Sequence, residues 1–152
     1  MTKLSDFDKE LLNLLQGEIP ICSHPFAQMA SRLGTDEGKV LNRLRELKAA
    51  GYLRRIGTFF DSNRLGYHGT LIALKVEPSA VDKVAQAVNR YPGATHNYER
   101  EDQYNLWFTL LTPNAECESN ILAEIRSLEG VEDMLKLKAN KKYKINVQFK
   151  LQ

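Results

Sequence analysis

The spacing of apolar residues changes once along this 152-residue chain, near Gly66. Before Gly66 they recur three and four positions apart, which predicts helices; after it, apolar runs of strand length alternate with helical stretches. The expected order in the second part is strand, helix, strand, strand, helix, strand, with one strand added at the end. That order predicts an α+β chain in which a helical N-terminal part precedes a ferredoxin-like βαββαβ domain.

The N-terminal part is predicted to begin with two short helices. Ser5 and Asp8 have the spacing of a capping box for the first helix, and Gly17 follows its last apolar residue. Pro25 suits the first position of the second helix, and Gly34 is placed to end it. Apolar residues at helical spacing give each helix one face to bury.

A third helix is expected over residues 36–50, with Thr35 as its N-cap and Gly51 after its end. The tight turn before it is typical of a helix-turn-helix unit. The next stretch, YLRRIGTFFD at residues 52–61, is expected to form a small β wing. We therefore predict a winged helix-turn-helix domain over residues 1–62.

Residues 63–152 are predicted to form the ferredoxin-like domain. Its two central strands are expected in THNYEREDQYNLWFTL, residues 95–110, which resembles a hairpin. The other expected strands and helices are residues 70–76, 80–91, 114–128, 131–138 and 143–149.

Composition and charge exclude several classes of protein. A net charge of +2 does not favour a strongly electrostatic nucleic-acid binder. The two cysteines form no CxxC pair or disulfide framework, and the N-terminus lacks the apolar segment of an export signal. No apolar run approaches the roughly 18 residues that a membrane span needs. A reduced, cytoplasmic protein with no membrane partner is the expectation.

The predicted hairpin carries the residues most suited to chemistry, including the only tryptophan of the chain. Because side chains alternate across a strand, His96, Tyr98 and Arg100 share one face. Arginine holds carboxylates with two hydrogen bonds, aromatic rings stack, and histidine delivers a proton near pH 7. This face therefore suits a planar ligand that bears carboxylates.

Two pairings of the hairpin are compatible with the sequence. A three-residue loop puts Arg100 beside Tyr104, whereas a two-residue loop pairs Arg100 with Asn105 and Tyr98 with Trp107. A purely structural interpretation is also open, because a lone histidine in a strand is usually a structural residue. Arg100 has acidic neighbours in sequence, and an exposed ion pair with one of them contributes little.

The charge distribution of the predicted helix-turn-helix does not favour DNA binding. Residues 1–56 hold nine basic and seven acidic residues, a net charge of only +2. Asp36 and Glu37 stand at the leading end of the third helix, where DNA contacts usually concentrate. The residues of that helix that are able to touch phosphates or bases are Lys39, Asn42, Arg43, Arg45 and Lys48. DNA is therefore not the expected partner.

The chain resembles the Lrp/AsnC-like family across nearly its whole length. RRIGTFFDSNRLGYHGT, residues 54–70, and THNYEREDQYNLWFTL, residues 95–110, resemble its sirohaem decarboxylase branch. The resemblance implies a carboxy-lyase that removes CO2, without an oxidant, from the C12 and C18 acetate side chains of sirohaem. The product is 12,18-didecarboxysirohaem, on the alternative haem pathway or in haem d1 formation. Iron arrives inside the substrate, so the resemblance implies no cofactor and no metal held by the protein.

An acetate on a pyrrole loses CO2 when the ring accepts the electrons left behind, and a proton must then reach the new methylene carbon. Under this resemblance, His96 is expected to be the general acid and Arg100 to hold or polarise a reacting carboxylate. The residues expected to shape the pocket or bind further carboxylates are Asn97, Tyr98, Tyr104, Asn105, Trp107, Arg54 and Arg55.

Asp102 stands where many relatives have a histidine. An aspartate is a poor ligand for haem iron and a poor acid at neutral pH. The resemblance therefore implies a heterodimer with a homologous decarboxylase subunit, paired through the sheets, in which the partner supplies the missing histidine. Two alternatives stay open: a catalytically silent subunit that completes its partner's site, and an Lrp/AsnC-type DNA-binding transcription regulator.

Overall fold

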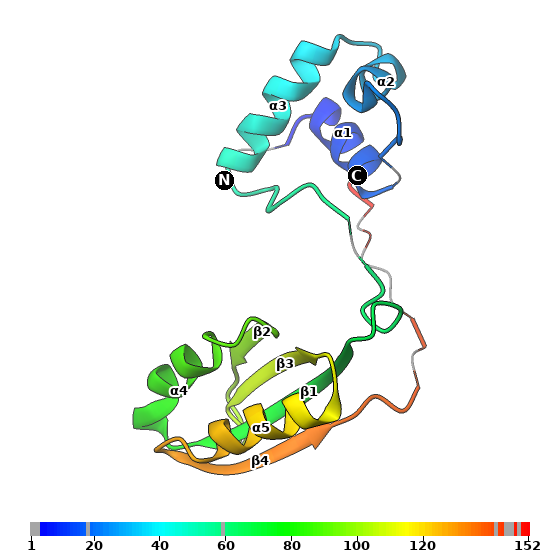
Figure 1. The fold of residues 1–152 in the computed structure, drawn as a ribbon. Helices are drawn as coiled ribbons and strands as arrows, with labels where there is room; N and C mark the ends of the chain where they lie inside the picture. Colours follow the sequence, from blue (N-terminus) through cyan, green and yellow to red (C-terminus); the bar gives the residue numbers. More distant parts are fainter. Residues whose placement is uncertain (1–3, 18, 59, 142, 145–147, 149) are drawn as a thin grey trace. The chain divides into compact units, whose positions relative to one another are not determined.

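The chain forms two compact units in a computed structural model (Figure 1). The structure describes residues 4–17, 19–58, 60–141, 143–144, 148 and 150–152. The N-terminal unit comprises Met1–Thr58 with Lys144–Gln152, and the sheet unit comprises Phe59–Tyr143. The division into residues 1–62 and 63–152 stays a prediction as to its boundary; the structure adds that the C-terminal segment groups with the N-terminal unit.

The described residues of the N-terminal unit form three helices, namely α1 (Asp6–Gln16), α2 (Pro25–Arg32) and α3 (Glu37–Ala49). The predicted capping box of α1 is confirmed. The backbone N–H of Asp8 donates to Ser5 Oγ at 3.2 Å, and the backbone N–H of Ser5 donates to Asp8 Oδ2 at 2.9 Å. The helix-turn-helix order therefore rests on local signals that the sequence carries.

The N-cap of α3 is Asp36, not the predicted Thr35. The Asp36 side chain accepts a hydrogen bond from the backbone N–H of Lys39 at 2.9 Å. Thr35 instead belongs to the preceding turn, where its backbone N–H donates to Ala30 O at 3.0 Å. Aspartate and threonine are both good N-caps, so residue preference alone does not decide between neighbours.

The core of the N-terminal unit gathers apolar side chains from all three helices. They are Leu11, Leu12, Met29, Ala30, Val40, Leu44 and Leu47. Leu151 packs against this core, and the Asn13 side chain bonds both of its backbone groups. Asn13 Nδ2 donates to Leu151 O, and Asn13 Oδ1 accepts from the N–H of Leu151, each at 3.1 Å. These contacts tie the described end of the chain to α1.

Two predicted strands do not occur among the described residues. The prediction of a wing over residues 52–61 is wrong, because the described part of that stretch contains no strand. Ile56 is 45% and Phe60 73% exposed, so these two apolar residues bury no face, whereas Leu53 packs against the core of the N-terminal unit. In the closing strand predicted at residues 143–149, the three described residues are not in a strand, and the others lie outside the described residues.

The sheet unit has the predicted ferredoxin-like order. Its elements are β1 (His68–Val76), the 3-10 turn η1 (Pro78–Ala80), α4 (Val81–Val88), β2 (Ala94–Glu99), β3 (Leu106–Thr112), α5 (Ala115–Arg126) and β4 (Val131–Leu137). The four strands form one antiparallel sheet in the order β2-β3-β1-β4. The hairpin therefore contributes one central strand, β3, and one edge strand, β2.

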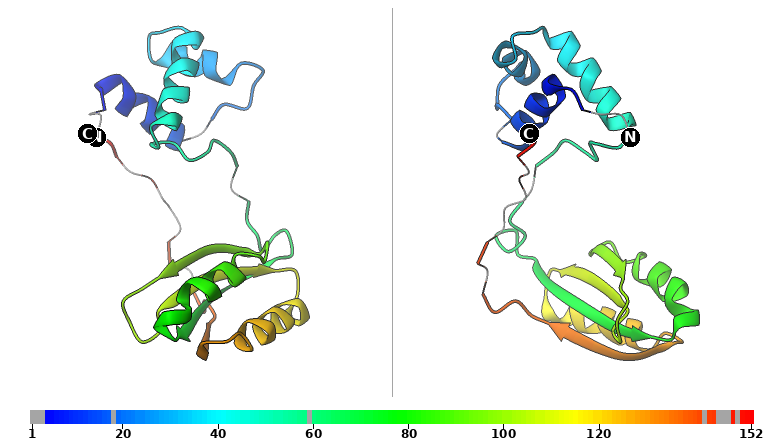
Figure 2. Two further views of the ribbon diagram at one scale, coloured as in Figure 1. Left: turned by 90° about the vertical axis from the view of Figure 1, so that its left-hand side faces the viewer. Right: turned by 180° about the vertical axis from the view of Figure 1, so that it is seen from behind.

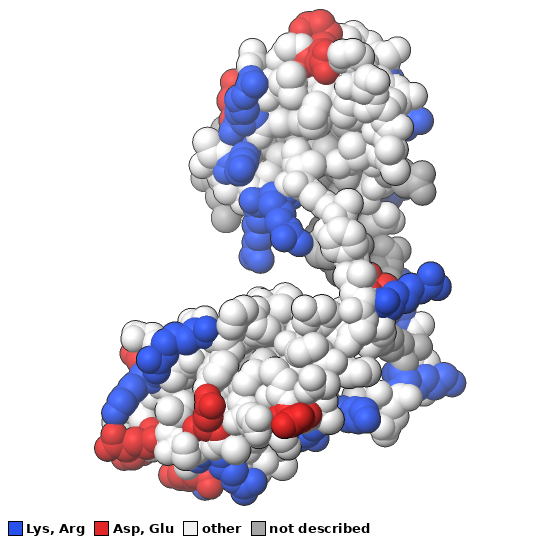
Figure 3. Space-filling model, viewed as in Figure 1, with Lys and Arg blue, Asp and Glu red and all other residues white. Residues whose placement is uncertain are grey.

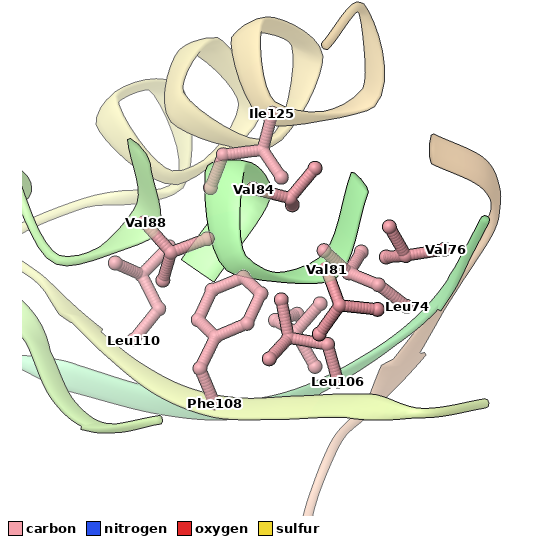
Figure 4. Close-up of a cluster of buried hydrophobic side chains, with 10 residues drawn as sticks. Leu74, Val76, Val81, Val84, Val88, Leu106, Phe108, Leu110 and Ile125 are labelled. Carbon is pink, nitrogen blue, oxygen red and sulfur yellow. The ribbon is translucent and has the colours of Figure 1, made fainter. Parts of the chain in front are cut away.

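Helices α4 and α5 lie on the same face of the sheet, as Figure 2 shows. The core lies between them and the strands, and Phe108 points from β3 into this layer (Figure 4). Its buried residues are Ile72, Leu74, Val76, Val81, Val84, Val88, Leu106, Phe108, Leu110 and Ile125. We call the opposite face of the sheet the open face, because none of the described helices of this unit covers it.

Gly93 allows the chain to enter β2 in close contact with β3. The backbone N–H of Leu111 donates to Gly93 O at 2.8 Å. A Cβ atom at Gly93 would lie 2.1 Å from the carbonyl oxygen of Leu111, a distance that no side chain tolerates. The approach of the two backbones therefore requires glycine at this position.

We predict that Gly93→Ala lowers the free energy of unfolding of the sheet unit by about 1–3 kcal/mol, because β2 has to move away from β3. Gly57→Ala is the matched control, since nothing lies within 4 Å of a Cβ added there. Urea titrations followed by the fluorescence of Trp107, which lies in β3, measure both variants. Equal midpoints for the two variants would contradict this role of Gly93.

Candidate functional site

The register of the hairpin places Tyr98 opposite Trp107. The backbone N–H of Arg100 donates to Asn105 O at 2.8 Å, which continues the same register. This is the second of the two pairings that the sequence allowed, and the pairing of Arg100 with Tyr104 does not occur. The loop, however, has four residues, 101–104, rather than the two that were expected for this pairing.

A β-bulge at the start of β2 decides which side chains reach the open face. Ala94 pairs with Leu110 and His96 pairs with Thr109, so one extra residue, Thr95, stands between two successive pairs. Ala94 packs against the core, whereas His96 lies beside Thr109 on the open face. Without the bulge, the alternation of the strand would put both residues on one face.

The open face carries residues of all four strands in three rows. The first row is Arg100, Asn105, Lys75 and Asp133; the second is Tyr98, Trp107, Ala73 and Leu135; and the third is His96, Thr109, Leu71 and Leu137. The first row is charged and polar, and the second and third are mainly aromatic and apolar. His96 and Arg100 therefore flank the pair of Tyr98 and Trp107.

His96 lies between a hydroxyl group and an aromatic ring. Thr95 Oγ1 is 3.1 Å from His96 Nδ1, and the rings of His96 and Tyr98 are 6.2 Å apart with an angle of 34° between their planes. Tyr98 is 55% exposed, and His96 is exposed as well. The imidazole is therefore open to a ligand that lies on the open face.

Arg100 and Trp107 hold each other in place. The guanidinium carbon of Arg100 lies 5.6 Å from the centre of the Trp107 ring, within the range of a cation–π interaction. Trp107 Nε1 donates to Tyr104 O at 2.6 Å, which fixes the indole plane. Trp107 therefore offers a fixed flat surface, with a cation beside it that is able to receive a carboxylate.

The side chain of Tyr104 is hydrogen-bonded to β4. Its hydroxyl donates to Asp133 Oδ2 at 2.6 Å. This hydrogen bond raises the pKa of Tyr104 and, from the other side, lowers the pKa of Asp133. Tyr104 therefore stays a neutral phenol that donates a hydrogen bond to Asp133. Asp133 is also the residue of β4 that pairs with Lys75 of β1.

The two asparagines of the motif make structural contacts. Asn97 lies on the face covered by helices, where its Nδ2 donates to Ala85 O and Asn89 Oδ1, each at 3.0 Å. Asn105 bonds both backbone groups of Val76, at 2.9 and 2.8 Å. The structure thus does not bring Asn97 to the open face, and the expected role of both residues in binding a ligand stays a prediction.

The remaining expected site residues, Arg54 and Arg55, lie outside the hairpin. Arg54 and Arg55 follow α3 in the N-terminal unit, so their role in binding carboxylates stays a prediction. Asp102 lies in the hairpin loop, where its carboxylate accepts from the backbone N–H of Gln103 at 2.5 Å. In the described part of the chain, no three metal-ligating side chains lie close enough together to hold a metal ion, and no helix is long and apolar enough to cross a membrane.

Sequence reasoning missed two components of the open face. One is Thr95, because simple alternation puts it on the face opposite His96, and the bulge has no sequence marker. The other is the apolar contribution of β1 and β4, where Leu71, Leu135 and Leu137 are each 39% exposed. The alternation of Leu135, Lys136 and Leu137 in β4 indicates that the two leucines share one face of the sheet. Only the strand register decides whether that face is the core face or the open face.

Several α3 side chains that were named as able to contact DNA form contacts within the N-terminal unit. Arg43 is tied inward: its Nε donates to Asp8 Oδ1 at 2.6 Å and its Nη2 to Asp8 Oδ2 at 2.8 Å. Arg45 donates to Asn42 Oδ1 at 2.7 Å. Figure 3 shows acidic atoms beside the basic ones on the side where α3 runs. Three of the five side chains named for DNA contact thus form hydrogen bonds within the unit, and Lys39 Nζ lies 5.1 Å from the centre of the Phe7 ring. The expectation that DNA is not the partner stays a prediction.

Comparison with known proteins identifies the family. A family model described as "AsnC-like ligand binding domain" matches residues 64–144, and one described as "Siroheme decarboxylase NirDL-like HTH domain" matches residues 8–54. The siroheme decarboxylase alpha subunit of Desulfovibrio desulfuricans is 42% identical over 99% of this chain and 87% of its own length. This chain belongs to the sirohaem decarboxylase family.

Other members differ in length and so in organisation. The siroheme decarboxylase NirD subunit of Pseudomonas aeruginosa is 38% identical over 98% of each chain. The crystal structure of siroheme decarboxylase NirDL in co-complex with an iron-uroporphyrin III analogue matches with a TM-score of 0.71 and 34% identity, over 95% of this chain and 48% of that one. E. coli AsnC, at 14% identity and a TM-score of 0.80, shows the shared fold alone.

We predict that the Asp8–Arg43 contact makes the stability of the N-terminal unit depend on pH. Asp8 is fully buried, and its hydrogen bond to Arg43 holds the pKa of the carboxyl well below its ordinary value of 3.8. A lowered folded-state pKa stabilises the fold above the unfolded value, and the contribution is lost as pH falls through the folded value. The loss is therefore expected to begin near pH 4 and to grow below it.

The Asp8→Asn variant measures this contribution. Its urea midpoint, followed by circular dichroism, is expected to lie below that of the wild-type protein at pH 7, and the difference is expected to shrink as the pH falls below 3.8. Asp6→Asn is the control, because the Asp6 side chain is 94% exposed. A difference that stays constant between pH 7 and pH 3 would count against the ion pair.

Proposed function

We propose that this chain is a subunit of a sirohaem decarboxylase that removes CO2, without an oxidant, from the C12 and C18 acetate groups of sirohaem. The product is 12,18-didecarboxysirohaem, an intermediate for haem or haem d1. The observation that carries the proposal is the open face, where an exposed histidine and an arginine flank a pair of aromatic side chains. Membership of the decarboxylase family supports the same reaction.

The spacing on β2 suits a ligand the size of a tetrapyrrole. His96 and Arg100 are four residues apart on an extended chain, which separates their backbones by about 13 Å. Between them Tyr98 and Trp107 lie side by side and present flat apolar surface. A macrocycle placed on this pair has its carboxylates at the rim, where they are accessible to Arg100 on one side and to His96 on the other. A small carboxylic acid spans only part of this site.

In the proposed reaction, the bond between the acetate methylene carbon and its carboxyl carbon breaks and CO2 leaves. The electron pair passes into the conjugated macrocycle, which the iron already inside the substrate polarises. His96 Nε2 then gives a proton to the methylene carbon, so a methyl group remains and the imidazolium becomes a neutral imidazole. Arg100 holds a carboxylate so that the acetate stays over the site. The residues thus supply orientation and one proton for each decarboxylation.

A homologous second subunit is the proposed partner. Relatives are named alpha subunit or NirD subunit, and the NirDL chain is about twice as long as its match here. In this chain the hairpin loop has Asp102, and aspartate as a residue type is a poor ligand for haem iron and a poor general acid. We propose that the partner provides that group and that the two sheets pair through their open faces. Leu71, Leu135 and Leu137 give this face exposed apolar surface to bury.

The proposed reaction is tested by anaerobic incubation with sirohaem, with the homologous subunit co-expressed and without it, followed by mass spectrometry. Loss of two CO2 is expected in the paired sample. His96→Ala is expected to slow turnover by roughly 10²–10⁴-fold while sirohaem still binds, because only proton delivery is removed. His24→Ala, at an exposed histidine of the N-terminal unit, is the control and should keep wild-type turnover.

Three outcomes separate the candidate functions. Wild-type turnover in His96→Ala would end the proposal that this histidine is the acid. Tight binding of sirohaem with no mass change in either wild-type sample would indicate a sensor rather than an enzyme. Absence of sirohaem binding together with sequence-specific, salt-sensitive binding to DNA would favour the transcription regulator.

A second prediction concerns the pairing of the sheets. Leu135→Glu places a charge in the apolar row of the open face and is expected to prevent co-purification with the homologous subunit, because a buried unpaired carboxylate opposes association. Ile21→Glu is the control, since Ile21 is fully exposed in the N-terminal unit. Size-exclusion chromatography with light scattering measures the assembly. An intact complex with Leu135→Glu would show that the subunits do not pair through this face.

A further inference from the structure

The bulge in β2 brings a hydroxyl group to the proposed acid. Thr95 Oγ1 lies 3.1 Å from His96 Nδ1, within hydrogen-bonding distance. In a regular strand, adjacent side chains point to opposite faces, so a threonine directly before the histidine would be directed away from it. Thr95 reaches the imidazole because it is the unpaired residue of the bulge.

We propose that Thr95 is a positioning residue for His96, which rests on the proposed role of His96 as the general acid. Its hydroxyl oxygen accepts a hydrogen bond from Nδ1–H, and this leaves Nε2 as the nitrogen directed to the ligand. The second partner of a functional histidine commonly fixes which of its nitrogens is reactive. The open face shows such a partner for only one of the two nitrogens of His96, among the described residues.

The proton balance agrees with this arrangement. In the imidazolium both nitrogens carry hydrogen, and Thr95 Oγ1 accepts from Nδ1–H. When Nε2 gives its proton to the methylene carbon, the neutral imidazole keeps Nδ1–H and therefore keeps the bond to Thr95. The ring does not have to rotate between the two states, so it is ready to be protonated again at Nε2 for the second acetate.

Threonine is well suited to this task at an exposed position. Its branched Cβ restricts rotation about χ1, so the hydroxyl keeps its direction even though Thr95 is exposed. On the other side, the tilted ring of Tyr98 limits how far the imidazole can swing. The imidazole is thus held from two sides by residues of its own strand, which is the support that an exposed catalytic side chain needs.

The test compares Thr95→Val, which keeps the branched shape and loses the hydroxyl, with Thr95→Ser, which keeps the hydroxyl. In the decarboxylase assay of the paired protein, Thr95→Val is expected to lower kcat by about 10-fold or more, with unchanged affinity for sirohaem. Thr95→Ser is expected to restore most of kcat. Wild-type kcat in Thr95→Val, or an equal loss in Thr95→Ser, would overturn the proposal.

A second measurement needs no turnover. The ¹⁵N chemical shifts of the imidazole of His96 in the free protein show which nitrogen carries hydrogen. The neutral imidazole is expected to carry hydrogen mainly on Nδ1 in the wild-type protein and in Thr95→Ser, and mainly on Nε2 in Thr95→Val. Identical shifts in all three proteins would overturn the role of Thr95. An inactive wild-type protein with the expected shifts would overturn the proposed reaction but leave the Thr95–His96 contact established.

Discussion

The antiparallel pairing of β2 with β3, interrupted by a single bulge, is the constraint on which the open face depends. Side chains alternate along a strand, so a shift of one residue would exchange every side chain of the edge strand between core and open face. The bulge at Thr95 makes that exchange once, between Ala94 and His96. Gly93 allows the required approach to β3, and Phe108 anchors that strand in the core. The chemistry of the face therefore rests on the backbone geometry of one hairpin.

The sequence carried enough information for the fold and for the residue types of the site. Helices and strands followed from apolar periodicity, and the start of α1 followed from Ser5 and Asp8. The predicted N-cap of α3 was wrong by one residue, because Thr35 and Asp36 are adjacent and both residue types are good N-caps. The predicted wing is absent from the described residues, where Ile56 and Phe60 stay exposed and give a hairpin no core to cover. The register and the bulge are properties of strand pairing, which local sequence patterns do not determine. The direction of Asn97, away from His96 and Tyr98, follows from simple alternation along β2.

The N-terminal unit matches a helix-turn-helix family model, and the chain shares its fold with E. coli AsnC. Its helices, caps and core are those of a helix-turn-helix, yet Arg43 is bound by a buried carboxylate and acidic residues accompany the basic ones along α3. The shared fold by itself says nothing about activity. The open face of the sheet is where aromatic surface, a cation and an exposed imidazole occur together in this chain.

The most direct test of the account is a crystal structure of this chain, with its co-expressed homologous subunit, bound to a non-reactive iron tetrapyrrole such as iron-uroporphyrin III. We expect the macrocycle to lie against Tyr98 and Trp107. We also expect a rim carboxylate to meet Arg100 and His96 Nε2 to approach an acetate group at hydrogen-bonding distance. A macrocycle bound away from the open face, or with His96 turned from it, would contradict the central claim.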